Sequence, residues 1–193
     1  MGEKDDYGIG VVLDTNLFDG VSPRKWGEVL GEFVYKNLAG QEMVMYDSEG
    51  NEERVYVANK NDRVQKDGAR NNHKVIDKLA RYNGDNLRAL ATIHLSELLE
   101  TSGDETRTEE HSHKWLDQNG WIYRYVYVQD RNGMIYKALL NIADGRDRKI
   151  IYDINNIRLI DKAKSTTGGA VPSAVSGGAR STSRSAFLQN STY

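Results

Sequence analysis

The side chains with the clearest capacity for chemistry are the histidines of this sequence. There are four, His73, His94, His111 and His113, and there is no cysteine. No pair has the HExxH spacing of a zinc-binding helix, and no third ligand accompanies the alternating His111 and His113. We therefore expect neither a metal site nor another cofactor.

Imidazole suits general acid–base catalysis because its pKa lies near neutrality. Metal-independent RNA cleavage needs a base for the 2′-hydroxyl, an acid for the leaving 5′-oxygen and cations for the charge that develops on the phosphate. The histidines supply the first two side-chain types, and Arg124 and Lys74 supply cations. The alternative is that each histidine caps a helix or lies on the surface.

The element that must position Arg124 is a three-stranded antiparallel sheet predicted between residues 121 and 161. Asn132 and Gly133 are a strong hairpin signal, because both positions of a type I′ turn need positive φ. With these two residues as the loop, Arg124 lies directly opposite Asn141. Arg124 and Asn141 then share one face of the sheet, and the other residues of that face are apolar: Ile122, Val126, Val128 and Leu139.

An unpaired guanidinium on such a face would be costly to bury. Arg124 is therefore expected to form a structural salt bridge, to lie at the edge of the core or to line a cleft. The third strand, 149–154, follows a loop at 144–148 and brings either Tyr152 or Asp153 to this face. A one-residue slip exchanges the faces, so both alternatives stay open.

The residues before this sheet predict an α+β domain, in which an N-terminal strand, helices and a hairpin precede the antiparallel sheet. A helix from Pro23 is indicated by Ser22 as N-cap and by an apolar stripe that continues to Leu38. The other expected elements are a strand at Ile9–Leu13, a hairpin of Met43–Tyr46 and Arg54–Val57, a helix beginning near Asn71 or Asn72, a strand at Ala89–His94, a short helix at Glu97–Thr101 and an exposed loop at Gly103–Glu110.

Composition divides the 193 residues into one domain, 1–162, and a tail, 163–193. Ser, Thr, Gly and Ala dominate the tail, which cannot bury enough apolar surface to offset its ordering entropy, so we expect a disordered tail or linker. The first residues do not have the layout of a signal peptide, and no apolar run has the length of a membrane span. We expect a cytoplasmic protein without membrane contact.

The net charge is only −2, but the segment from Lys60 to Arg88 has eight bases and four acids. A local basic patch of this kind could attract a phosphate-bearing partner, and Lys74 and Lys78 are its candidate contacts. The alternative is an ordinary solvated helix face.

Several short segments, taken in order, resemble one group of proteins. The segments are Asn72–Leu79, Ala91–Leu98, His113–Asp117, Trp121–Arg124, Leu140–Ile142 and Ile151–Ile154. The group is the phage-associated barnase–EndoU–colicin–RelE-like nuclease domains of large polyvalent proteins in phages and mobile elements. The resemblance covers about residues 7–161. It implies helices followed by a curved antiparallel sheet, and metal-independent ribonuclease chemistry.

The resemblance implies roles for particular residues. The candidate catalytic residues are His113, His94, Arg124 and Tyr152. The candidate substrate-binding residues are Lys74, His73, Asn141 and Lys78. The two catalytic histidines would be acid and base, Arg124 and Lys74 would stabilise phosphate, and Asn141 and Tyr152 would orient it.

The leading hypothesis is therefore a metal-independent endoribonuclease of the toxin or effector type, with RNA as substrate and an antitoxin or host protein as a further partner. One alternative is a non-enzymatic phage protein that inhibits a host defence complex or binds nucleic acid through the basic patch. Another is a structural or assembly domain of a phage or mobile-element protein.

Overall fold

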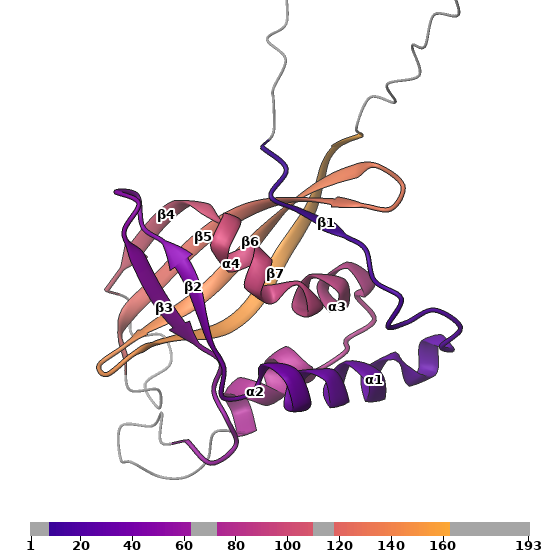
Figure 1. Ribbon diagram of the computed structural model, residues 1–193, viewed down its shortest axis with the longest axis horizontal. Coiled ribbons are helices and arrows are strands. Elements are labelled where there is room, and N and C mark those ends of the chain that lie inside the picture. Colours follow the sequence, from indigo (N-terminus) through magenta and orange to yellow (C-terminus); the bar gives the residue numbers. More distant parts are fainter. Residues whose placement is uncertain (1–7, 63–72, 110–117, 163–193) are drawn as a thin grey trace, which may run out of the picture.

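The computed structural model describes residues 8–62, 73–109 and 118–162 (Figure 1). The predicted tail, 163–193, lies outside them. The elements are β1 (Val11–Leu13), a helical segment made of η1 (Pro23–Lys25), α1 (Trp26–Phe33) and η2 (Val34–Leu38), then β2 (Glu42–Tyr46), β3 (Glu52–Tyr56), α2 (His73–Ala80), α3 (Asn86–Ile93), α4 (Leu95–Thr101), β4 (Gly103–Thr108), β5 (Gln118–Asp130), β6 (Met134–Gly145) and β7 (Lys149–Lys162). The α+β class and the order of a strand, helices and a hairpin before the long strands are confirmed.

The strands form one seven-stranded sheet in the order β1-β5-β6-β7-β3-β2, and β4 pairs with β5 beside β1. The predicted antiparallel set is β5, β6 and β7, whereas β1 joins β5 and β3 joins β7 in parallel. The sheet curls strongly. As a result Arg107 of β4 and Glu53 of β3 form an ion pair of 3.4 Å, although three strands lie between β4 and β3 in the sheet order.

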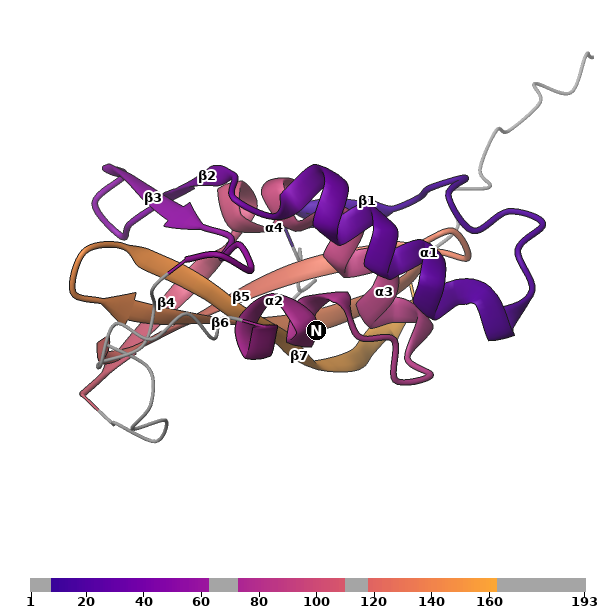
Figure 2. The same cartoon turned by 90° about the horizontal axis from the view of Figure 1, so that it is seen from below.

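The helices pack mainly on one face of β5–β7, and Figure 2 shows the sheet below α1 and α4. A second, smaller cluster packs Val75 of α2 and Ala58 against Trp121, Ala143 and Tyr152. Successive side chains of a strand point to opposite faces, so alternate residues of β5 and β6 meet the helices. The inward residues of these two strands are Ile122, Val126, Val128, Ala138, Leu140 and Ile142. They pack with apolar residues of every helix, and each large side chain that is buried fully contributes about 1.5–3 kcal/mol.

The β5–β6 hairpin has a three-residue loop, 131–133, and not the predicted loop of two. Gly133 has a φ of 75° and donates its N–H to the carbonyl oxygen of Asp130 at 3.0 Å. The carboxylate of Asp130 also accepts the backbone N–H groups of Asn132 and Met134. Asp130 therefore caps a loop in which only the glycine takes the left-handed conformation.

This extra loop residue shifts the whole register by one. Arg124 lies opposite Leu140, and Asn141 lies opposite Tyr123 on the other face of the sheet. The predicted pairing of Arg124 with Asn141 is wrong, because a one-residue shift exchanges the two faces of a strand.

Three other predictions differ from the structure. Residues 89–93, predicted as a strand, belong to α3, whose N-cap Asp85 accepts the backbone N–H of Arg88 at 3.0 Å. Residues 103–108, predicted as a loop, form β4 along the edge of β5. The third long strand does not end at residue 154 but continues to Lys162.

Candidate functional site

Arg124 is enclosed by protein groups. Its side chain is 3% exposed, and it donates to the carbonyl oxygen of Ser102 at 2.7 Å and to Glu105 Oε2 at 3.0 Å. Of the alternatives open for this residue, the structure shows the structural salt bridge. A guanidinium whose forked donors face a carbonyl and a carboxylate inside the core does not offer them to a phosphate.

The predicted histidines are not gathered around Arg124 in the described residues. His94 joins α3 to α4, with Nδ1 3.2 Å from Glu97 Oε2 and Nε2 3.0 Å from the carbonyl oxygen of Asp14. It belongs to the helical layer, whereas Asn141 is on the opposite face of the sheet. His113 lies outside the described residues, and His73 and Lys74 begin α2 with side chains that are not described.

Tyr152 and Asp153 make contacts of different kinds. The Asp153 carboxylate binds Arg88 at 2.7 Å and Lys78 at 3.1 Å, and Arg88 also donates to three backbone carbonyl oxygens. Tyr152 packs edge-on against Trp121, with ring centroids 5.1 Å apart, and Lys78 lies over its ring at 4.1 Å. Arg88 and Lys78, two cations of the predicted basic patch, are therefore engaged in contacts within the fold.

A different, mostly polar set of side chains lies on the face of β5–β7 opposite the main core, and one end of this face is buried where Trp121 and Tyr152 pack with Val75 of α2. We call this set the tyrosine face. Its members are Tyr123, Tyr125 and Tyr127 of β5, Lys137, Leu139 and Asn141 of β6, and Asn155, Asn156, Arg158 and Ile160 of β7.

The tyrosine face is organised in rows that cross the three strands. The rows are Tyr127–Lys137–Arg158, Tyr125–Leu139–Asn155 and Tyr123–Asn141–Asp153. Each row begins with a tyrosine of β5. The first row continues with two cations, and the second continues with Leu139 and Asn155. The third ends at Asp153, which is outside the tyrosine face because Arg88 and Lys78 bind its carboxylate.

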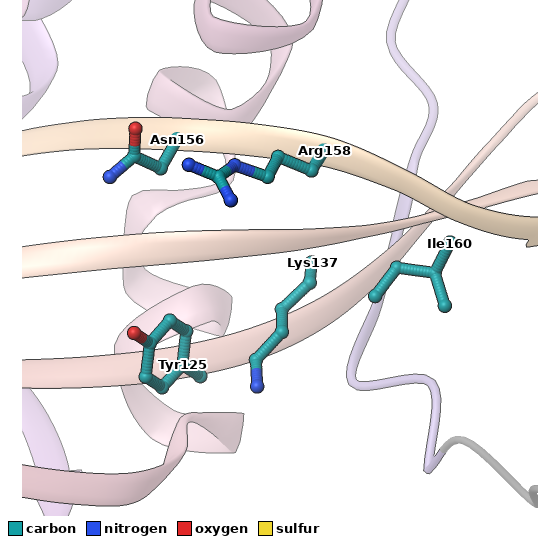
Figure 3. A pocket seen from close by; sticks show the side chains of 5 residues that line it. All are labelled: Tyr125, Lys137, Asn156, Arg158 and Ile160. Atoms are coloured by element: carbon teal, nitrogen blue, oxygen red, sulfur yellow. The ribbon is translucent and has the colours of Figure 1, made fainter.

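The cationic end of this face is hollowed. Its cavity of about 260 Å³ is lined by Tyr125, Lys137, Asn156, Arg158 and Ile160 (Figure 3). Lys137 Nζ lies 4.0 Å from the centroid of the Tyr125 ring, a cation–π distance. Asn156 has a φ of 50° where the β6–β7 register shifts, and this bulge places it beside the cavity. The arrangement combines flat aromatic surface with positive charge.

Sequence reasoning missed Lys137 and Arg158. The alternation of Tyr123, Tyr125 and Tyr127 is visible in the sequence and marks one face of a strand. The cations that join them could not be found, because the predicted register put Ala138 opposite Tyr127 and the predicted third strand ended before Arg158.

No protein-family model, curated protein or solved structure matches this chain. Within the described residues, no helix is long and apolar enough to cross a membrane. Across the same three ranges, no group of three or more His, Cys, Asp or Glu side chains is placed to hold a metal ion.

Proposed function

We propose that the tyrosine face binds single-stranded nucleic acid. The observation that carries this proposal is the cavity in which Lys137 and Arg158 lie beside Tyr125 on the sheet face opposite the main core. Bases of a single strand stack on aromatic side chains, each stack contributing about 1–3 kcal/mol, and lysine and arginine neutralise the phosphates. A duplex has its bases already stacked inside, so the tyrosines would add little to its binding.

The internal contacts of the segment 60–88 support this face over the basic patch predicted from sequence. Arg88 is buried, and Lys78 is paired with Asp153. By contrast, Arg158 is exposed and lines the cavity. Of these described cations, Arg158 is therefore better placed for a ligand than Arg88 or Lys78.

Fluorescence anisotropy with labelled 12-nucleotide RNA and DNA single strands, and with the matching duplexes, tests the proposal. We expect Lys137→Ala with Arg158→Ala to weaken single-strand binding about tenfold or more, because two phosphate contacts are lost. The matched control is Arg24→Ala with Lys36→Ala, which removes the same two residue types from exposed positions on the helical segment. Wild-type protein that binds no single strand at low salt contradicts the proposal, as does equal weakening by the control pair.

A metal-independent ribonuclease is the second candidate. It is favoured by the arrangement of layers, with helices on one face of the sheet and hydroxyl and cationic side chains on the other. The resemblance to the phage-associated nuclease domains implies helices followed by a curved antiparallel sheet, with such side chains on the sheet and the adjoining helix. The test is incubation of RNA with protein in EDTA, where the wild type should cleave and His113→Ala and Lys137→Ala should not. Binding without cleavage by the wild type leaves the first function and removes the second.

A further inference from the structure

The cations among the described residues of the tyrosine face lie in one row. Lys137 of β6 is directly opposite Arg158 of β7, and both line the cavity. In the next row toward the buried end of the face, Leu139 and Asn155 carry no charge. In the other direction along β7 comes Asp161, which is negative. A nucleic acid strand that ran parallel to the β-strands would therefore leave the cations after one row.

The two cations reach toward different sides of the cavity. Lys137 extends toward β5, where its Nζ lies 4.0 Å from the ring centroid of Tyr125 and 5.5 Å from that of Tyr127. Arg158 extends along β7 toward Asn156 (Figure 3). Their backbones are on neighbouring strands, which lie about 4.8 Å apart in a sheet. Because the side chains diverge from that spacing, each cation is suited to a phosphate of its own.

The β7 side of the cavity is open to such a contact. The side chain of Arg158 is exposed and makes no hydrogen bond or ion pair to another described residue. Asn156 beside it has a φ of 50°, which is uncommon outside glycine and is a form of strain often found at ligand sites. Its exposed amide adds a neutral N–H donor next to the guanidinium.

Two phosphates on one row require the nucleic acid to cross the β-strands. A dinucleotide has one internal phosphate and a trinucleotide has two, so three nucleotides are enough to meet both cations. Tyr125 and Tyr127 lie at the β5 end of this path, where a base next to the Lys137 phosphate can stack. Further nucleotides would meet no additional cation among the described residues of the face.

We infer that the tyrosine face binds a single strand that crosses β5, β6 and β7, with two successive phosphates on Lys137 and Arg158, so that a trinucleotide occupies the whole site. The inference rests on the proposed function of the tyrosine face and defines the ligand of that face. Each cation has its own phosphate, and the length of strand that contributes to binding is three nucleotides.

Competition by unlabelled oligothymidylates of two, three, four, six and twelve nucleotides against a labelled 12-nucleotide strand tests the length. We expect the trinucleotide to bind the wild type about threefold or more tighter than the dinucleotide, because it adds one phosphate contact. Above three nucleotides, affinity should rise only with the number of positions in which a trinucleotide can lie. Affinity that rises beyond this statistical factor up to six or twelve nucleotides overturns the inference.

Trinucleotides in which one phosphate is replaced by a neutral methylphosphonate test the pairing of cations with phosphates. Either replacement should weaken wild-type binding about threefold or more. Lys137→Ala should become insensitive to one replacement, and Arg158→Ala should become insensitive to the other. If both variants lose sensitivity to the same replacement, the two cations share one phosphate and the inference is overturned.

The matched controls are Arg24→Ala and Lys36→Ala, which remove the same residue types from exposed positions on the helical segment. They should stay sensitive to both replacements, and loss of sensitivity in them overturns the inference. A wild type that binds the 12-nucleotide strand but not the trinucleotide also overturns it and leaves the proposed function standing. A wild type that binds no strand overturns the proposed function itself. The length series needs no variant, so it decides even if a substitution unfolds the protein.

Discussion

Arg88 and Arg124 are buried cations that join segments far apart in the sequence. Arg88 ties the end of α2 to β7 through Asp153 and backbone carbonyl oxygens, and Arg124 ties β5 to β4 through Glu105. Protein acceptors make the burial of both tolerable: Arg88 donates to Asp153 and three carbonyl oxygens, and Arg124 donates to Glu105 and the carbonyl oxygen of Ser102, although its Nε has no partner among the described residues. A residue type suited to phosphate chemistry is used here to hold the fold together.

The exchange of Arg124 for alanine should therefore be a stability defect. We expect Arg124→Ala to lower the free energy of unfolding by about 3 kcal/mol, because it breaks a buried ion pair and leaves the largely buried carboxylate of Glu105 with Arg107 as its remaining partner. Urea unfolding followed by circular dichroism measures the change. Arg124→Met combined with Glu105→Leu should lose less, since no unpaired charge remains. An Arg124→Ala protein of normal stability that lacks RNA cleavage would instead support the catalytic role.

At the scale of elements, the β5–β6 hairpin shows how one side chain sets a register. Asn132 and Gly133 are compatible with a two-residue loop, but Asp130 accepts two backbone N–H groups across a three-residue loop. Only Gly133 then needs a positive φ. The register places Tyr127 opposite Lys137 and so creates the cationic row.

Two glycine-to-alanine substitutions, one in this loop and one in a helix, should have effects of opposite sign on stability. Gly133→Ala should destabilise the protein by about 1 kcal/mol, because a Cβ is unfavourable at positive φ. Gly31→Ala in α1 should stabilise it by about 0.5–1 kcal/mol, since a Cβ there meets no atom within 4 Å and alanine is the better helix former. Thermal unfolding of both variants gives the signs, and an unchanged midpoint for Gly133→Ala contradicts the loop conformation.

At the scale of the whole molecule, a net charge of −2 gives no general attraction to nucleic acid. Affinity must come from the local arrangement on the tyrosine face. The curl of the sheet contributes to this arrangement, because it gathers β2, β3, α1 and α4 on the side of β5–β7 opposite the tyrosine face (Figures 1 and 2).

The salt dependence of binding should show how many phosphate contacts the protein makes. With Lys137 and Arg158 as the phosphate contacts, the logarithm of the association constant should fall with the logarithm of salt concentration at a slope of about −1.4, since each contact to a single strand contributes about −0.7. Titrations between 50 and 300 mM salt, roughly the range where such slopes are linear, measure it. A slope steeper than about −3 would indicate a larger basic surface, such as the segment 60–88.

Local signals in the sequence were sufficient for most elements. The helix that begins at Pro23, the hairpin of β2 and β3 and the start of α2 follow from caps, turns and apolar spacing, and all three are present. The run 89–94 is too short for its apolar pattern to distinguish a strand from a helix, and tertiary packing made it α3. The polar sequence of β4 has no alternating apolar pattern, and it is a strand because it pairs with the edge of β5.

The candidate site depended on contacts that no local pattern contains. The sequence by itself determined that three tyrosines alternate along one strand and that a hairpin follows them. The tertiary structure decided which residues stand opposite those tyrosines, because the Asp130 loop and the bulge at Asn156 set the registers on either side of β6. It also decided that Arg124 faces inward to Glu105 while Lys137 and Arg158 face outward, since the face of a strand changes with a single residue of register.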